Sequence, residues 1–214
     1  PLLGEQTDTA ALERLGNEGV LALVCDSTNA LVPGTSGSES TVRESLADLI
    51  GTLKGRVAVT GFASNIARLD SIARAARRHG RQIALVGRSM QKMVAAAREC
   101  GYLKDFPPVL DEVEAMELPA HKVLLLCTGS QGERRAAMAR IADDSHPNVH
   151  LAQGDSVIFS SRVIPGNELA IFELQNQLAA LGIELLTAEY HFVHVSGHPC
   201  REELAQMYRW IRPR

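Results

Sequence analysis

The chain has 214 residues, of which 45% are hydrophobic and 22% are charged, and its formal net charge is −3. This composition is typical of a folded globular protein and excludes a disordered or fibrous chain. No stretch reaches the roughly 20 apolar residues needed to cross a membrane. The slight negative charge argues against a broad basic surface for nucleic acid, so we expect any such contact to be local.

Short apolar runs rich in Val, Ile and Leu alternate with longer amphipathic segments. The predicted strands are residues 19–25, 56–60, 82–86, 122–127, 156–160 and 183–188. The predicted helices are residues 40–53, 65–78, 91–99, 134–141, 168–181 and 201–211. Strands this apolar are buried on both faces. The pattern therefore predicts an α/β fold with a mostly parallel, doubly wound (Rossmann-like) sheet and helices on both faces.

Four cysteines are scattered along the chain without a CxxC pair: Cys25, Cys100, Cys127 and Cys200. Two of them end apolar runs that are predicted to be buried strands. Unpaired cysteines of this kind are typical of reduced, small core residues. We therefore expect a cytoplasmic protein without disulfides.

Polar loops follow five of the predicted strands, at residues 26–29, 61–65, 87–89, 128–133 and 160–162. In parallel sheets ligands bind beyond the carboxyl ends of the strands. The loop between Gly129 and Gly132 is compatible with a structural turn or with an anion site. The sequence contains neither GxGxxG after the first strand nor GxxxxGK[ST], so the specific nucleotide fingerprints are missing.

Asp26 closes a predicted strand and is followed by Ser27, Thr28 and Asn29. A carboxylate in this place can orient a catalytic base or bind a metal. The same residue types also cap turns and helices by bonding nearby backbone N–H groups. The local sequence leaves both interpretations open.

Three histidines, His191, His194 and His198, lie close together in the segment YHFVHVSGH. A metal site is disfavoured because the HxxHxxxH spacing lacks a matching carboxylate or cysteine partner and Gly197 interrupts a helix. In an extended segment, alternation places His194, Ser196 and His198 on one side, which suits contact with a phosphate or a leaving oxygen. Surface histidines without a ligand are the alternative.

Seven segments, in this order, resemble ribonuclease J: DSTNA at 26–30, FASN at 62–65, VGRSM at 86–90, TGSQGE at 128–133, IFSS at 158–161, IPGNE at 164–168 and HVSGH at 194–198. Members of that family are metallo-β-lactamase-fold nucleases with an inserted β-CASP domain. They degrade RNA from its 5′ monophosphate end and also cut it internally. The resemblance implies that residues 1–36 are the edge of the metallo-β-lactamase domain, 37–198 the β-CASP domain and 199–214 a helix returning to the former domain.

By the same resemblance, Asp26 and His198 are expected to be catalytic. The carboxylate orients the imidazole, which protonates the leaving 3′ oxygen. Ser161, His194 and Ser196 are expected to bind an RNA phosphate. No residue of this chain is expected to bind a metal, because the family's HxHxDH motif and its other zinc ligands are missing. Two zinc ions are expected in the full-length protein, and this chain is expected to be a fragment that is inactive by itself.

The resemblance further implies RNA as the partner, preferably with a 5′ monophosphate, together with the remaining metallo-β-lactamase domain and a homo-oligomeric parent protein. Two alternatives come from other classes. A stand-alone nucleotide- or phosphate-binding Rossmann-like module predicts affinity for a free nucleotide. A non-catalytic interaction domain predicts self-association with no phosphate pocket occupied.

Overall fold

The computed structural model describes residues 2–3 and 5–214, which divide into two compact units. The terminal unit comprises the described residues up to Ser38 together with Val195–Arg214, and the sheet unit comprises Glu39–His194. The sequence places its boundaries at residues 36 and 198 instead. Which residues belong to a metallo-β-lactamase domain stays a prediction.

Six short strands form the centre of the sheet unit: β1 (Val57–Thr60), β2 (Gln82–Val86), β3 (Val109–Leu110), β4 (Val123–Cys127), β5 (Ser156–Phe159) and β6 (Glu184–Thr187). They pair in the order β3-β2-β4-β1-β5-β6, and each pair is parallel. Every residue of β1, β4 and β5 is buried, as expected for strands covered on both sides. The α/β fold with a parallel sheet is confirmed.

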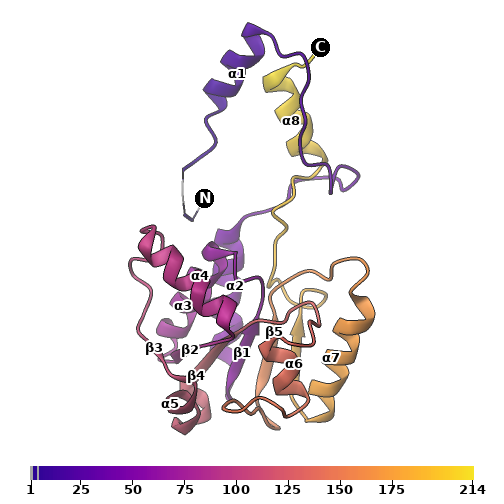
Figure 1. Cartoon of the computed structure of the whole chain (residues 1–214). Helices are drawn as coiled ribbons and strands as arrows, with labels where there is room; N and C mark the ends of the chain where they lie inside the picture. The colour runs from indigo at the N-terminus through magenta and orange to yellow at the C-terminus, as the bar shows by residue number, and fades with distance from the viewer. Residues whose placement is uncertain (1, 4) are drawn as a thin grey trace. The chain divides into compact units, whose positions relative to one another are not determined.

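The helices of the sheet unit are α2 (Glu39–Thr52), α3 (Ile66–Arg78), α4 (Arg88–Glu99), α5 (Glu112–Glu117), α6 (Ala137–Ala142) and α7 (Glu168–Ala180), with a short 3-10 helix, η1 (Ala120–Lys122) (Figure 1). From β1 through β2 to β3 the chain moves toward one edge of the sheet, and from β3 through β4 and β5 to β6 it moves toward the other edge. Right-handed crossovers therefore place α3 and α4 on one face and α5, α6 and α7 on the other.

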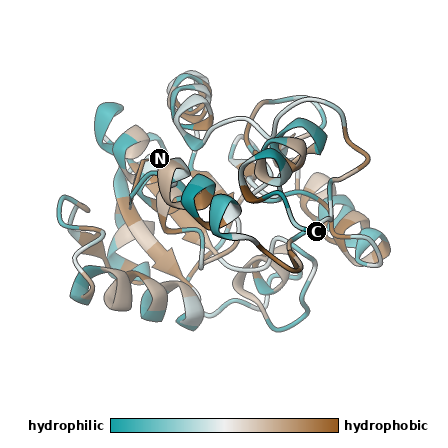
Figure 2. Ribbon diagram, turned by 90° about the horizontal axis from the view of Figure 1, so that it is seen from above, coloured by the Kyte–Doolittle hydropathy of each residue, from teal (hydrophilic) through white to brown (hydrophobic). Residues whose placement is uncertain are grey.

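Alternate strand residues form the two cores of the sheet unit. Ala58, Leu125 and Val157 share one buried apolar cluster with residues of α5, α6 and α7. Their neighbours Val59 and Leu126 point to the opposite face, where α2 and α3 pack together and cover the sheet. Figure 2 shows the apolar strands between helices that mix apolar and polar residues.

The terminal unit is built on α1 (Thr9–Glu18) and α8 (Arg201–Ile211), which pack together. The Asp8 carboxylate caps α1 by accepting the Ala11 amide at 2.8 Å. A Cβ at Gly16 would lie 2.2 Å from the Trp210 carbonyl oxygen, so the close approach of the two helices requires glycine.

Residues 19–25 do not form the predicted strand. Leu21 and Val24 are 81% and 98% exposed. The prediction was wrong because an apolar run becomes a strand only where a neighbouring strand pairs with its backbone, and no strand of the described residues does so. The sequence also missed α1, α5 and the two-residue strand β3, and it began the helix before β5 at residue 134 instead of Ala137.

All four cysteines are free thiols, as expected. Cys127 and Cys200 are buried, but Cys100 is exposed and Cys25 is half-buried, so only the first two are core residues. Cys25 lies outside a core because the run before it is not a strand. Within the described part of the chain, no helix is long and apolar enough to cross a membrane.

Candidate functional site

Asp26 and His198 are hydrogen-bonded to each other in the terminal unit. Asp26 Oδ2 contacts His198 Nδ1, and Asp26 Oδ1 accepts the Thr28 amide at 2.8 Å. The hydrogen bond with His198 is the main cause that lowers the pKa of Asp26 to about 2, and the bonds with Thr28 add to it. An ionised carboxylate only accepts hydrogen bonds, so Nδ1 of His198 must carry a proton. Nε2 has no hydrogen-bond partner among the described residues and is the nitrogen that can act on a substrate.

Asn29 holds the two segments that carry this pair. Its buried side chain donates from Nδ2 to the His198 carbonyl oxygen at 3.2 Å and to Ser196 Oγ at 3.1 Å. Asn29 also forms a parallel β-bridge with Cys200. The approach of Asp26 to His198 is therefore fixed by backbone and amide contacts as well as by their own bond.

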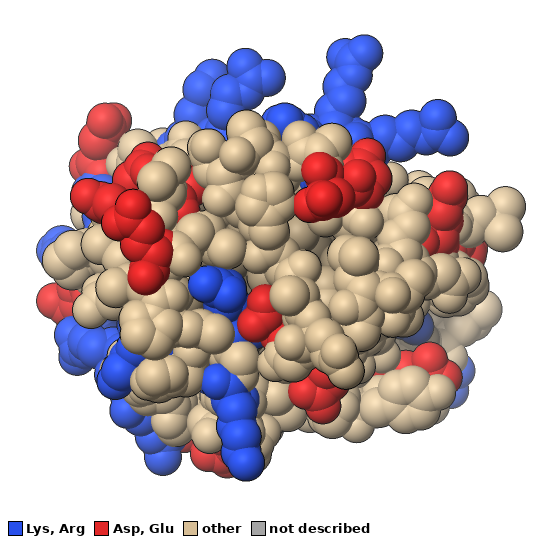
Figure 3. Space-filling model, turned by 90° about the horizontal axis from the view of Figure 1, so that it is seen from below, with Lys and Arg blue, Asp and Glu red and all other residues tan. Residues whose placement is uncertain are grey.

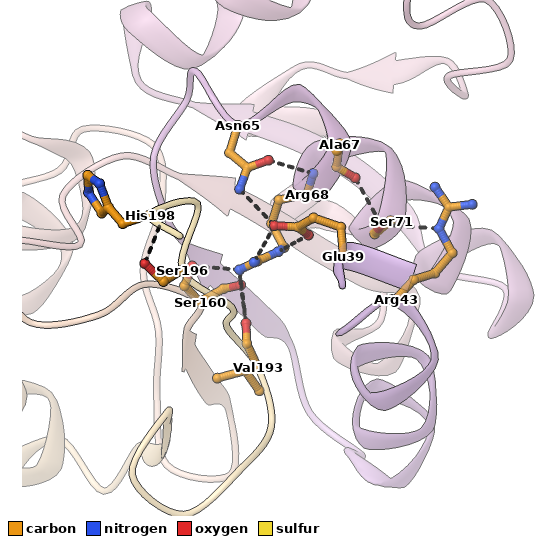
Figure 4. A network of polar contacts seen from close by, with 10 residues as sticks. All are labelled: Glu39, Arg43, Asn65, Ala67, Arg68, Ser71, Ser160, Val193, Ser196 and His198. Carbon is orange, nitrogen blue, oxygen red and sulfur yellow. Dashed lines mark hydrogen bonds and ion pairs between the residues drawn. The ribbon is translucent and has the colours of Figure 1, made fainter. Parts of the chain in front are cut away.

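Ser196 is oriented to donate a hydrogen bond. Its Oγ accepts the Asn29 amide and, at 3.1 Å, the backbone N–H of His198, a bond that Figure 4 shows. A hydroxyl has two acceptor positions and one hydrogen. Because both acceptor positions are filled, the hydrogen of Ser196 remains for an acceptor such as a phosphate oxygen.

Arg68 of α3 joins the end of β5 to the segment before His194 (Figure 4). Its Nη1 donates to the Ser160 carbonyl oxygen at 3.0 Å, to Ser160 Oγ at 2.7 Å and to the Val193 carbonyl oxygen at 3.0 Å. Its Nε and Nη2 bond the Glu39 carboxylate at 2.9 and 2.7 Å. The side chain is only 3% exposed, and a buried charge is tolerated only when it is paired and hydrogen-bonded in this way.

Ser161 and His194 directly follow the two segments that Arg68 joins. Ser161 is 6% exposed, and its Oγ accepts a bond of 3.3 Å from Gln131 Nε2. The same nitrogen donates to the Arg162 carbonyl oxygen at 3.0 Å. Gln131 comes from the loop after β4, so loops after two strands fix Ser161 together with Arg68.

The ring nitrogens of His194 make no hydrogen bond to a described residue. Its Nδ1 is buried and has no hydrogen-bond partner among the described residues. Burial, and next the positive charge of Arg68, lower the pKa of His194 to about 4. The ring is therefore neutral near pH 7. A buried polar atom without a partner marks a place that a ligand or a water completes.

The predicted site residues fall into two groups. The terminal unit brings together Asp26, Ser196 and His198, and the sheet unit brings together the segments of Ser161 and His194. The residues that hold these groups were not predicted as site residues: Asn29, Glu39, Arg68 and Gln131. Asn29 and Gln131 lie within polar loops that the sequence had already pointed to. Arg68 gave no such signal, because an arginine on an amphipathic helix is typical of a solvated residue.

The described residues contain no group of three or more His, Cys, Asp or Glu side chains that could hold a metal ion. Nδ1 of His198 is already bonded to the Asp26 carboxylate. These residues do not fit a zinc site.

Charges of both signs are spread over the face of the molecule seen in Figure 3. That face carries no continuous field of Lys and Arg. A polyanion such as RNA is attracted over a distance only by clustered positive charge. This face therefore offers a polyanion no extended positive surface.

A protein-family model described as "Ribonuclease J, beta-CASP domain" matches residues 54–178, which is more than half of the chain. The chain belongs to the ribonuclease J family. The family expected from the seven segments is thereby confirmed. The match to the ribonuclease J model includes Arg68, Gln131 and Ser161.

Curated relatives match over the full chain. Ribonuclease J of Sinorhizobium meliloti is 50% identical over 213 residues, and that of Mycolicibacterium smegmatis is 44% identical over 215 residues. Ribonuclease J of Thermus thermophilus is 42% identical over 214 residues. Each alignment covers 100% of this chain but only 38%, 38% and 37% of the respective relative. The chain thus spans less than two fifths of the length of these ribonuclease J proteins.

Proposed function

We propose that this chain is the β-CASP part of a ribonuclease J-type nuclease that acts in RNA processing and decay. In this proposal the full-length protein is a zinc-dependent 5′-to-3′ exonuclease and endonuclease, and the chain supplies its RNA-binding wall. The Asp26–His198 pair carries the proposal, because an ionised carboxylate fixes one ring nitrogen and leaves the other open.

The proposed role of His198 is general acid catalysis. When the phosphodiester bond breaks, the leaving 3′ oxygen takes a proton from Nε2 of His198. Asp26 keeps Nδ1 protonated and orients the ring, so it is a positioning residue. A positioned acid of this kind typically accelerates a reaction by about 10²- to 10⁴-fold.

Ser161, His194 and Ser196 are proposed to bind an RNA phosphate, preferably the 5′ monophosphate. Ser196 has a free hydroxyl hydrogen, and His194 has an open Nδ1 on a ring that is neutral near pH 7. Neutral donors recognise a phosphate by geometry, which suits a chain with a net charge of −3.

Zinc belongs to the proposal only through the full-length protein. The described residues of this chain do not fit a zinc site, so no step above depends on the metal. We infer that the ligands of the two ions lie in the remaining metallo-β-lactamase domain. The four free cysteines support a reducing compartment, and we infer that the protein acts in the cytoplasm.

The test replaces His198 by Ala in the full-length protein. We expect turnover of a short 5′-phosphorylated RNA to fall by about 10²- to 10⁴-fold, with little change in RNA affinity, because the lost proton transfer belongs to the bond-breaking step. Asp26→Asn should lower turnover less and change its pH profile. His191→Ala is the matched control, since His191 makes no side-chain bond among the described residues.

Single-turnover kinetics and RNA binding, measured on the same preparations, separate the two effects. Unchanged turnover in His198→Ala would remove His198 from the acid role. An equal loss in His191→Ala would point to a general disturbance of this segment instead.

A further inference from the structure

A pocket of about 670 Å³, whose lining includes several charged side chains, lies at the carboxyl ends of β2 and β4. Segments 87–92 and 128–140 form most of its lining, and Ser161 and His194 are not part of it. The pocket exists because β2 and β4 are neighbours whose following helices, α4 and α6, leave on opposite faces of the sheet. Such a crevice is the usual place for a ligand in this class of fold.

Three exposed cations line this pocket without a partner of their own. Arg88, Lys92 and Arg135 make no side-chain hydrogen bond or ion pair among the described residues. A fourth, Arg140, uses one nitrogen for the Ser145 carbonyl oxygen at 3.2 Å. By contrast, Arg68 in the same unit is fully engaged with Glu39 and backbone oxygens.

The lining has fewer acidic than basic side chains, and each acidic one already accepts a hydrogen bond. Glu112 accepts the Asn148 side-chain amide at 2.9 Å, and Glu133 accepts the Gln131 backbone amide at 2.9 Å. His146 is also part of the lining, and burial lowers its pKa, so it adds no charge near pH 7. The pocket therefore has an excess of positive charge, although the chain as a whole is negative.

The pocket also exposes backbone. Gly87 and Gly129 have φ of +112° and +110°, and a Cβ at Gly87 would lie 2.5 Å from Thr128 Oγ1. Neither position accepts a side chain without strain. Helix α4 begins directly after Gly87 and has no side chain capping its first amides. These amides add donors beside the cations, as in other anion sites.

We propose that this pocket binds the phosphate group of a nucleotide, either within an RNA strand or as a free mononucleotide. Phosphate is the chemistry that three unpaired cations and free amides recognise together. The volume lies within the range of about 300 to 1,000 Å³ that is typical of small-ligand sites. The RNA source rests on the proposed function, whereas the affinity for phosphate does not.

The experiment uses the full-length protein carrying Ser161→Ala, His194→Ala and Ser196→Ala, which removes the phosphate contacts proposed above. The probes are inorganic phosphate and adenosine 5′-monophosphate, followed by calorimetry, and a short 5′-hydroxyl RNA, followed by fluorescence anisotropy. Lys92→Gln and Arg135→Gln should each weaken binding by about tenfold, because each removes a charge-assisted bond. Arg134→Gln is the matched control, since Arg134 is the adjacent, exposed arginine and does not line this pocket.

The results distinguish a phosphate within an RNA strand from that of a free mononucleotide. A loss that appears with adenosine 5′-monophosphate as well as RNA assigns the pocket to a free nucleotide, and a loss with RNA alone assigns it to a phosphodiester of the strand. Equal losses in Arg134→Gln and Arg135→Gln, or no binding of any probe, overturn the proposal. The His198→Ala result is independent, so failure here does not decide the proposed function.

Discussion

The two groups of site residues are held in different ways. In the sheet unit, Ser161 and the segment before His194 are fixed by the buried side chains of Arg68 and Gln131. In the terminal unit, the side chains of His198 and Asp26 are 53% and 39% exposed and sit on loops. The first group thus lies at the edge of a packed core, whereas the second group is held in place by a few contacts between loops.

This difference has a physical meaning for function. A phosphate contact gains from rigidity, because a preorganised donor loses little entropy on binding. An acid that protonates a leaving oxygen must instead present its outer nitrogen to a substrate. The exposure of His198 is consistent with that need, whereas the burial around Arg68 would hinder it.

The largest effect that tests this comparison is on stability. Arg68→Gln removes a guanidinium that is only 3% exposed, and the charge of Glu39 then loses this partner and keeps the bond from Asn65 Nδ2 at 3.1 Å. We expect the free energy of unfolding to fall by about 3 to 5 kcal/mol. Arg78→Gln on the same helix is the control, because its contact with Glu44 is exposed and should be worth less than about 1 kcal/mol.

Urea unfolding of the chain and both variants measures the two changes. If Arg68→Gln cost no more than Arg78→Gln, the Arg68 contacts would not be what fixes Ser161 and His194. The comparison between a packed and a loop-held group would then fail.

The next effect is on binding. Ser196→Ala removes the hydroxyl whose hydrogen is free, and its affinity for a short 5′-phosphorylated RNA should fall by about 1 to 2 kcal/mol, as for a lost charge-assisted bond. Stability should change little, because Asn29 keeps its bond to the His198 carbonyl oxygen. Binding titrations with the full-length protein measure it, and equal affinity would exclude Ser196 from phosphate contact.

The smallest effect is a change in pH dependence. The pKa of His194 is lowered from 6.5 to about 4, so between these values the unfolded chain binds more protons than the folded one. Stability from this group is therefore full above pH 6.5 and is lost as the pH falls toward 4. His194→Gln should flatten the curve in that window, as measured by urea unfolding at a series of pH values. A variant curve parallel to that of the parent chain would show that His194 is not held neutral.

The sequence by itself determined the fold class and most of its elements. Apolar runs such as residues 122–127, between amphipathic segments, can bury both of their faces only in a sheet that helices cover on both sides. The loops that follow these strands were also readable, because parallel strands place their carboxyl ends at one edge. Asp26 and His198 were singled out from their local sequences, but their catalytic roles followed only from the resemblance of their segments to the family.

Only the tertiary structure decided which side chains meet. Asp26 and His198 are far apart in the sequence, and no local pattern predicts that Asn29 holds their segments together. Arg68 has the sequence signature of a solvated helix residue, yet the fold buries it against Glu39. Conversely, residues 19–25 have the signature of a strand but have no partner strand in the described structure. Local sequence specifies propensity and polarity, whereas burial and pairing depend on which distant segments the fold brings together.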